Sequence, residues 1–94
     1  MKLSWDEAKR QATLETRGLD FAQAGELFDT LNFNYTIEDL RCDYGENRYI
    51  SFGLISERLC AVVWTPREAG RHIISMRKAN DREQKSYNIS AGSR

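Results

Sequence analysis

The fold is decided by residues 48–78, RYISFGLISERLCAVVWTPREAGRHIISMRK. Three runs rich in apolar, β-branched and aromatic residues lie within it, at 48–54, 59–65 and 72–76, and such runs are typical of β-strands. The connections between them are short, the longer one being a turn predicted at 66–70. Because short connections join neighbouring antiparallel strands, this stretch predicts three strands of a meander.

A further strand is predicted immediately upstream of this meander. Over residues 31–37, Leu31, Phe33, Tyr35 and Ile37 alternate with polar side chains, as in a strand that has one face in water. Downstream of the meander, Asn80 or Asp81 is expected to cap a final helix that runs through Tyr87. Residues 90–94 are expected to form a disordered tail.

Two helices are predicted before the first strand. Ser4 and Glu7 have the spacing of a capping box, and Gly18 suits the left-handed end of that helix. A second helix is expected to begin at Asp20, and its helical spacing gives an apolar stripe of Phe21, Ala24, Leu27 and Phe28. The aromatic residues predicted to lie in the core are Trp5, Phe21, Phe28 and Trp64.

The predicted fold class is therefore α+β, with two N-terminal helices, a four-stranded antiparallel sheet and one C-terminal helix. A chain of 94 residues is expected to form a single domain, residues 1–94. With 40% hydrophobic and 30% charged residues, its composition is that of a globular protein rather than a disordered one. Helices would cover one face of the sheet and leave the other partly open.

Several classes of function are disfavoured by missing motifs. The two cysteines, Cys42 and Cys60, lack zinc-site spacing, and the chain has one histidine, so neither a metal nor another cofactor is expected. The sequence contains no GxGxxG, P-loop, HExxH or Gly-x-Ser-x-Gly motif. No apolar segment follows Lys2, and the longest apolar stretch, 59–64, is too short to span a bilayer. We therefore expect a cytoplasmic protein with no membrane partner.

The charges are unevenly distributed along a chain whose formal net charge is zero. Residues 66–94 hold seven basic and three acidic side chains, a net charge of +4, which leaves −4 on residues 1–65. A local basic patch on a neutral protein attracts a polyanion. The alternative is a solvated surface with scattered charges.

The strand predicted at 72–76 supplies the candidate site. Period-two alternation predicts an exposed face that carries Arg71, Ile73, Ser75 and Arg77. The same alternation predicts a core-facing side with His72, Ile74 and Met76. Lys78 and Arg82 would close around the exposed arginines, and converging guanidinium groups suit a phosphate. The alternative is that these arginines form surface ion pairs with Glu46, Asp81 or Glu83.

Three other residues are candidates for chemistry. Glu46 is expected to form an ion pair with Arg48 and would serve as a general base. His72, the one histidine, is either a packing residue or a general acid–base group. Tyr87 either packs the last helix against the sheet or stacks on a nucleic-acid base.

Several short segments give the chain a resemblance to a known family. They are 5–9 (WDEAK), 18–21 (GLDF), 28–29 (FD), 45–48 (GENR), 62–65 (VVWT), 73–80 (IISMRKAN), Arg82-Glu83 and Tyr87. In this order and spacing, from Trp5 to about Tyr87, the chain resembles the BrnT family of toxins. The segment 73–77, Ile-Ile-Ser-Met-Arg, is the most distinctive.

The resemblance implies a RelE-like fold and a ribonuclease that stops translation. It also implies a cognate antitoxin protein as partner, with operator DNA bound only through that antitoxin. The substrate would be RNA, including ribosome-bound mRNA. The expected reaction is metal-independent, with the ribose 2′-hydroxyl attacking the adjacent phosphorus.

Roles follow for the candidate residues under this hypothesis. The residues expected to act in catalysis are Arg77, Arg71, Lys78, Glu46 and His72, with the cations stabilising phosphoryl charge. Glu46 would be the base and His72 or Tyr87 the acid. The residues expected to bind RNA are Arg82, Arg48, Lys85 and Tyr87. The substitution Arg77→Ala is expected to abolish toxicity without unfolding the protein.

One departure from the family leaves other functions open. Members commonly have Lys-His-Gly at the end of the first helix, whereas this chain has Thr16-Arg17-Gly18. If that histidine takes part in RNA cleavage, this chain is either weakened or uses Arg17 differently; if it only caps the helix, little changes, because arginine also suits a helix C-terminus. The alternatives are a non-catalytic module or decayed toxin that docks an antitoxin as a co-repressor, and a plain nucleic-acid-binding domain.

Overall fold

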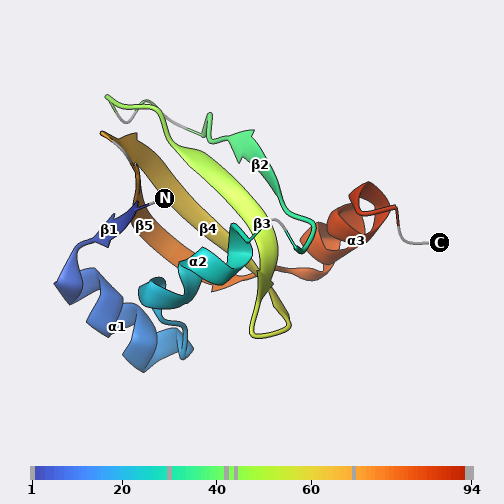
Figure 1. Ribbon diagram of the computed structural model, residues 1–94, viewed down its shortest axis with the longest axis horizontal. Coiled ribbons are helices and arrows are strands. Elements are labelled where there is room, and N and C mark those ends of the chain that lie inside the picture. The colour runs from blue at the N-terminus through green and yellow to red at the C-terminus, as the bar shows by residue number, and fades with distance from the viewer. Residues whose placement is uncertain (1, 30, 42, 44, 69, 93–94) are drawn as a thin grey trace.

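The computed structural model describes residues 2–29, 31–41, 43, 45–68 and 70–92. Within these residues the chain forms a five-stranded mixed sheet with α-helices at both ends of the sequence (Figure 1). The elements, in chain order, are β1 (Lys2–Trp5), α1 (Glu7–Arg17), the 3-10 turn η1 (Phe21–Gln23), α2 (Ala24–Leu27), β2 (Tyr35–Glu38), β3 (Tyr49–Ile55), β4 (Arg58–Arg67), β5 (Gly70–Lys78) and α3 (Asp81–Ser90).

The sheet has the strand order β1-β5-β4-β3-β2. The strands β2 to β5 form the predicted antiparallel meander. The strand β1 was not predicted, and it pairs in parallel with β5, from Lys2 opposite Gly70 to Trp5 opposite Ile73. The prediction of a four-stranded, purely antiparallel sheet is therefore wrong in detail, although the α+β class is confirmed.

The missed strand has a local cause. Ser4 lies in β1, and the residue that caps α1 is Asp6, whose side chain accepts a hydrogen bond from the Ala8 amide at 2.9 Å. Because Ser4 and Glu7 have capping-box spacing, the sequence pattern placed the helix start two residues too early. The other end of α1 is as predicted, with Gly18 in the left-handed region at φ 69°.

The remaining boundaries differ modestly from the prediction. The second helix is short, consisting of η1 and α2, and Asp20 caps it by accepting a hydrogen bond from the Ala22 amide. The strand predicted over 31–37 extends only over β2, and the turn predicted at 66–70 is shorter because Pro66 and Arg67 belong to β4.

The final helix begins at the predicted place. Asn80 caps α3 through a capping box with Glu83, and the helix continues through Ser90. Of the tail predicted at 90–94, Ser90 is therefore helical and residues 91–92 form a turn, whereas 93–94 lie outside the described residues.

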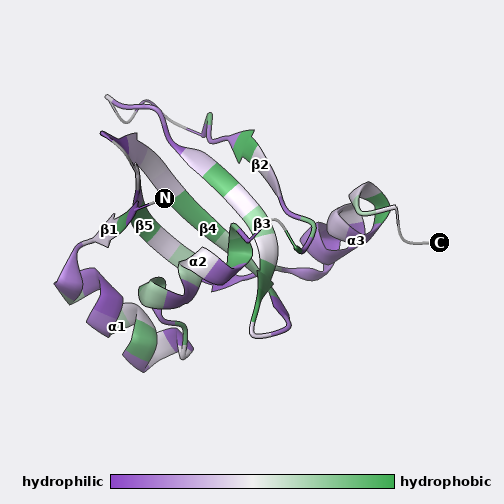
Figure 2. Ribbon diagram, viewed as in Figure 1, coloured by the Kyte–Doolittle hydropathy of each residue, from purple (hydrophilic) through white to green (hydrophobic). Residues whose placement is uncertain are grey.

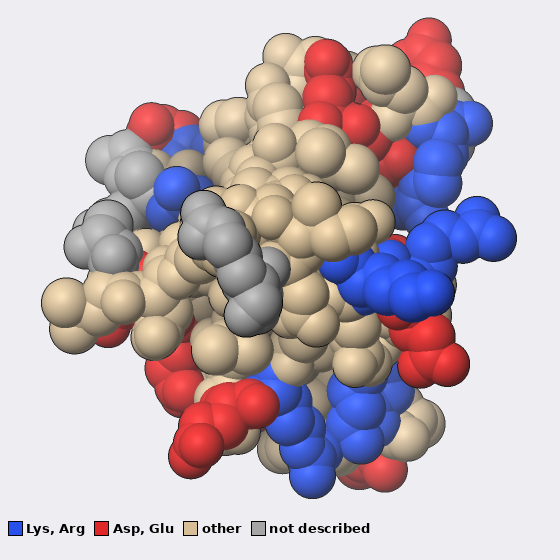
Figure 3. All heavy atoms as spheres, turned by 90° about the vertical axis from the view of Figure 1, so that its right-hand side faces the viewer, with Lys and Arg blue, Asp and Glu red and all other residues tan. Residues whose placement is uncertain are grey.

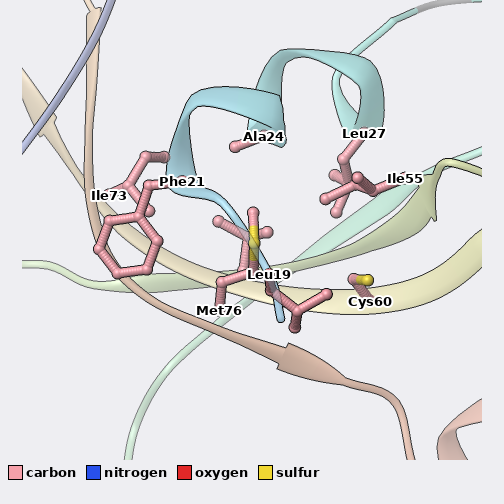
Figure 4. Packing of buried hydrophobic residues seen from close by; sticks show 9 residues of the cluster. Leu19, Phe21, Ala24, Leu27, Ile55, Cys60, Ile73 and Met76 are labelled. Atoms are coloured by element: carbon pink, nitrogen blue, oxygen red, sulfur yellow. The ribbon is translucent and has the colours of Figure 1, made fainter. Parts of the chain in front are cut away.

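Two apolar clusters hold the sheet, one on each face. One face of the sheet is covered by η1 and α2 and is here called the helix-covered face (Figure 1). There Phe21, Ala24 and Leu27 project from η1 and α2 toward buried sheet residues (Figure 4). The predicted core aromatics Trp5, Phe28 and Trp64 are half-buried against this cluster. The buried residues of the cluster are Leu19, Phe21, Ala24, Leu27, Ile55, Cys60, Val62, Ile73 and Met76.

The opposite face of the sheet, here called the open face, has a smaller cluster. Its buried members are Ile50, Phe52, Ala61, Val63 and Tyr87. Among the described residues, the helical member of this cluster comes from α3, which lies at one end of the sheet (Figure 1). Apolar and polar segments alternate along the strands, whereas α1 is largely hydrophilic (Figure 2). Within the part of the chain that the structure describes, much of the open face has no helix above it, as the sequence predicted.

Candidate active site

A β-bulge in β5 decides which side chains share a face. Ser75 pairs with Val63 and Ile73 pairs with Trp64, so Ile74 is an extra residue between the two pairs. As a result, Ile73 and Met76, three residues apart, both lie in the cluster on the helix-covered face. Strict alternation forbids that arrangement. The face assignment made from the sequence is therefore wrong on one side of Ile74.

The bulge separates the two arginines that were expected to converge. Arg71 lies on the helix-covered face, where its guanidinium carbon is 3.9 Å from the ring centre of Phe28 and 4.8 Å from that of Trp64. Burial lowers the pKa of Arg71 below its ordinary value. Arg77 pairs with Ala61, a buried apolar residue of the open face. The prediction that Arg71 and Arg77 form one phosphate site is thus wrong.

Arg77 instead forms the ion pair that the sequence offered as the alternative. Its two terminal nitrogens donate to the two carboxylate oxygens of Glu83 at 2.7 and 2.9 Å. This contact raises the pKa of Arg77 and lowers that of Glu83. Glu83 also accepts a hydrogen bond from the Asn80 amide, so the pair is part of the start of α3. Lys78, by contrast, is exposed and pairs with Cys60 of the helix-covered cluster.

A different group of side chains gathers at the other end of the open face. This group is here called the open-face cluster, and it consists of Ser4, Glu46, Arg48, Arg67 and His72. Glu46 forms ion pairs with Arg48 at 3.4 Å, as predicted, and with Arg67 at 3.5 Å. The Oγ of Ser4 is 2.9 Å from Nδ1 of His72. The cluster thus combines a carboxylate, an imidazole, a hydroxyl and two guanidinium groups.

The segment that carries Glu46 is fastened to the sheet. Thr65, 2% exposed, donates a hydrogen bond from Oγ1 to the carbonyl oxygen of Asn47 at 2.7 Å. On the other side, the carbonyl oxygen of Arg48 accepts from the Asp39 amide at 2.8 Å. These two bonds hold the entry into β3 beside β4. Hydrogen bonds to Asn47 and Arg48 therefore fasten the segment that carries Glu46 and Arg48.

His72 is half-buried within the open-face cluster, and its surroundings lower its pKa below the ordinary value of 6.5. Burial is the largest cause, and the positive charge of Arg67 adds to it. The negative charge of Glu46 acts in the opposite direction, and at the start of α1 Lys9 lowers the pKa while Asp6 raises it. The imidazole is therefore more often neutral at pH 6.5 than a histidine in water.

Arg77 lies on the same face as His72 but far along the strand. Five residues separate them, which is about 16 Å at the usual rise per strand residue. Arg41 is close enough to Arg77 for its charge to lower the pKa of Arg77. Figure 3, which faces the α3 end, shows Lys and Arg in separate groups with Asp and Glu beside them. The basic side chains thus do not form one continuous patch at this end.

Some candidates were identified from the sequence and others were missed. Glu46, Arg48 and His72 lie in one cluster, whereas Arg67 was overlooked because its position was assigned to a turn. Ser4 was overlooked because it was read as a helix cap. Arg82 and Lys85 are exposed on α3.

Tyr87 fits the packing alternative rather than base stacking. It is buried, and its hydroxyl donates a hydrogen bond to the carbonyl oxygen of Phe33 at 2.6 Å. Its ring also contacts the rings of Phe33 and Tyr35. These contacts fasten α3 to the segment that leads into β2.

Comparison with known protein families assigns the chain to one of them. Residues 5–83 match the model of a family described as the ribonuclease toxin, BrnT, of type II toxin–antitoxin systems. The chain belongs to the BrnT family. The match includes α1 to β5 and the open-face cluster apart from Ser4, whereas of β1 it includes only Trp5. No curated protein and no solved structure matches the chain.

Arg17, the position at which the sequence resemblance leads us to expect a histidine, has a contact of its own. It lies at the end of α1, and its Nη1 donates a hydrogen bond to the carbonyl oxygen of Met76 at 2.9 Å. Helix α1 rises about 1.5 Å per residue, so Arg17 lies about 16 Å along it from Asp6, whose charge acts on His72. Arg17 is therefore a link between α1 and β5, outside the open-face cluster.

Arg17→Ala is expected to lower the free energy of unfolding by about 1 kcal/mol, because one hydrogen bond and a favourable helix-end charge are lost. The rate at which the variant cleaves RNA should be the same as that of the wild-type protein. Urea unfolding followed by circular dichroism measures the first effect, and an RNA cleavage assay the second. A large loss of cleavage with unchanged stability would contradict this placement.

Other classes of site find little support among the described residues. No group of three or more His, Cys, Asp or Glu side chains in that part of the chain is arranged to hold a metal ion. Cys60 is buried, and burial raises the pKa of its thiol, whereas Cys42 lies outside the described residues. Across the described ranges, no helix has the length and apolar character needed to cross a membrane.

Proposed function

We propose that this BrnT-family chain is a metal-independent endoribonuclease of the cytoplasm, which stops translation by cleaving RNA and is neutralised by a cognate antitoxin. The observation that carries the proposal is the open-face cluster, in which Glu46 contacts both Arg48 and Arg67 and lies near His72. A base, an acid and two cations at one place are what phosphodiester cleavage by an internal nucleophile requires.

In the proposed reaction the ribose 2′-oxygen attacks the adjacent phosphorus and the bond from phosphorus to the 5′-oxygen breaks. Glu46 accepts the proton of the 2′-hydroxyl, and His72 donates a proton to the departing 5′-oxygen. Arg48 and Arg67 stabilise the extra negative charge on the phosphoryl oxygens. The products are a 2′,3′-cyclic phosphate and a 5′-hydroxyl end, and no step draws on a metal ion.

The open face also suits the binding of a flexible polyanion. Arg48 and Arg67 lie at one end of it and Arg77 at the other, with Arg41 near Arg77. A single strand of RNA that crosses the sheet would meet positive charge at both ends. Arg82 and Lys85 on α3 would extend this path. An acidic segment of the antitoxin would block RNA by occupying the same surface, and operator DNA would be bound through the antitoxin.

The rival function is a non-catalytic module or decayed toxin that serves as a co-repressor. The feature that favours it is Arg17 in place of the histidine common in the family. The distance of Arg17 from the open-face cluster weighs against it. The two functions differ in whether the free protein changes RNA.

The test is induced expression in a bacterial host, followed by growth and by gel analysis of cellular RNA. We expect growth arrest together with RNA fragmentation. Purified protein incubated with RNA, with and without ribosomes and with EDTA present, should yield cyclic-phosphate ends. Unimpaired growth and intact RNA from soluble, folded protein would refute the ribonuclease and favour the co-repressor.

Arg77→Ala is expected to lower RNA cleavage by less than about tenfold, because Arg77 contributes one flanking phosphate contact. Arg48→Ala is expected to lower cleavage by roughly 100-fold, because it removes a donor that stabilises the transition state. Both rates are measured on the same RNA, with circular dichroism as the control for folding. A larger loss of cleavage in Arg77→Ala than in Arg48→Ala would contradict this proposal and would place the catalytic centre at Arg77, as the sequence suggested.

A further inference from the structure

The strand missed in the sequence brings one more residue to the proposed site. Strand β1 lies beside β5 and pairs with it in parallel (Figure 1), and in this register Ser4 is opposite His72. The side chains of Leu3 and Trp5 pack on the helix-covered face, so alternation sends Ser4 to the open face. There its Oγ lies 2.9 Å from Nδ1 of His72.

The close approach of the two strands depends on a glycine. A Cβ atom at Gly70 would overlap the carbonyl oxygen of Lys2, its partner in β1. Glycine therefore lets β1 lie against β5 and places Ser4 within hydrogen-bonding distance of the imidazole. The contact joins residues 68 positions apart, and it exists only because β1 is part of the sheet.

We propose that Ser4 is a positioning residue for His72, whose hydroxyl holds Nδ1 so that Nε2 is the nitrogen that exchanges a proton with RNA. This inference rests on the proposed ribonuclease function. A serine hydroxyl both donates and accepts hydrogen bonds. Here it accepts from Nδ1–H both in the imidazolium and in the neutral ring that remains after Nε2 has given up its proton, so the ring keeps its orientation in both protonation states.

A hydroxyl suits this role better than a carboxylate. A carboxylate at position 4 would stabilise the imidazolium and hold the proton that His72 must release. The charged groups that act on His72 are already distributed around it: Arg67 from β4, Glu46 from the segment before β3, and Lys9 and Asp6 from the start of α1. Ser4 adds orientation to this set without adding charge.

The contact is tested first by a titration that does not depend on activity. His72 is the one histidine of the chain, so its imidazole signals in an NMR spectrum are unambiguous. Wild-type His72 is expected to titrate below pH 6.5, and Ser4→Asp should raise its pKa by about one unit or more, because the new carboxylate would lie beside the ring. Ser86→Asp, the same change on exposed α3, is the matched control and should cause no comparable shift.

The role is tested by kinetics on RNA. Ser4→Ala should lower kcat about tenfold with KM nearly unchanged, because the ring loses its orientation and not its affinity for RNA. Ser4→Thr, which keeps the hydroxyl, should restore kcat to within about twofold of wild type. Thermal unfolding of each variant controls for folding, and Ser4 is exposed, so little change is expected.

The outcomes separate this inference from the proposed function. If Ser4→Asp shifts the pKa of His72 no more than Ser86→Asp does, the contact and the inference are overturned. If wild-type protein cleaves RNA and Ser4→Ala cleaves equally well, the positioning role is overturned and the ribonuclease stands. If wild-type protein leaves RNA intact, the ribonuclease falls and the role of Ser4 falls with it. A tenfold loss of kcat in Ser4→Ala, together with near wild-type kcat in Ser4→Thr, supports both the positioning role of Ser4 and the ribonuclease function.

Discussion

Glu46→Gln is expected to lower RNA cleavage by roughly 100- to 10,000-fold, the range usual for loss of a general base. Glutamine has the same shape but cannot take the proton of the 2′-hydroxyl. The change also removes the carboxylate that contacts Arg48 and Arg67. The measurement is the cleavage rate of purified protein on RNA, together with growth after induced expression.

Glu15→Gln is the matched control for this prediction. Glu15 is an exposed residue of α1, and its charge is absent from the groups that shift the pKa of His72. We expect the control to cleave RNA at the wild-type rate and to arrest growth. A Glu46→Gln protein that is folded and cleaves as fast as this control would exclude Glu46 as the base.

Phe21→Ala is expected to lower the free energy of unfolding by about 3–5 kcal/mol. The Phe21 side chain is fully buried at the centre of the helix-covered cluster, where it faces Ile73 and Met76 (Figure 4). Its removal leaves a cavity that the sheet and the short η1 turn cannot close. Small domains have a total stability of about 5–15 kcal/mol, so the variant should unfold at a much lower urea concentration.

Leu40→Ala provides the comparison for this stability prediction. Leu40 is 78% exposed, so its truncation is expected to change the free energy of unfolding by at most about 0.5 kcal/mol. Both variants are measured by urea unfolding monitored by tryptophan fluorescence and circular dichroism. Equal losses from the two substitutions would contradict the core described for the helix-covered face.

The elements that the sequence predicted correctly rest on local signals. The meander of β2 to β5 follows from apolar runs joined by short turns. Gly18 ends α1 and Asn80 caps α3, because each position requires a residue of a particular kind within one helical turn. The ion pair between Glu46 and Arg48 was also predictable, since the two residues are only two positions apart in the segment that leads into β3.

The errors in the predicted site come from one extra residue in a strand. The bulge at Ile74 reverses the alternation of β5, so Arg71 stacks on Phe28 and Trp64 while Arg77 lies on the other face. Nothing in the local sequence marks the bulge, because Ile73, Ile74 and Met76 are all apolar and suit either face. The choice is made by the fit of Ile73 and Met76 into the cluster below η1 and α2.

The sequence by itself determined the α+β class, the meander, the end of α1 at Gly18, the cap of α3 at Asn80 and the BrnT family, because these depend on residue type and spacing along the chain. The tertiary structure alone decided that β1 joins the sheet, that Ser4 contacts His72 and that Arg67 meets Glu46. Those contacts join residues 68 and 21 positions apart. Pairings of that kind are selected by burial and backbone hydrogen bonding over the whole sheet, which no local pattern records.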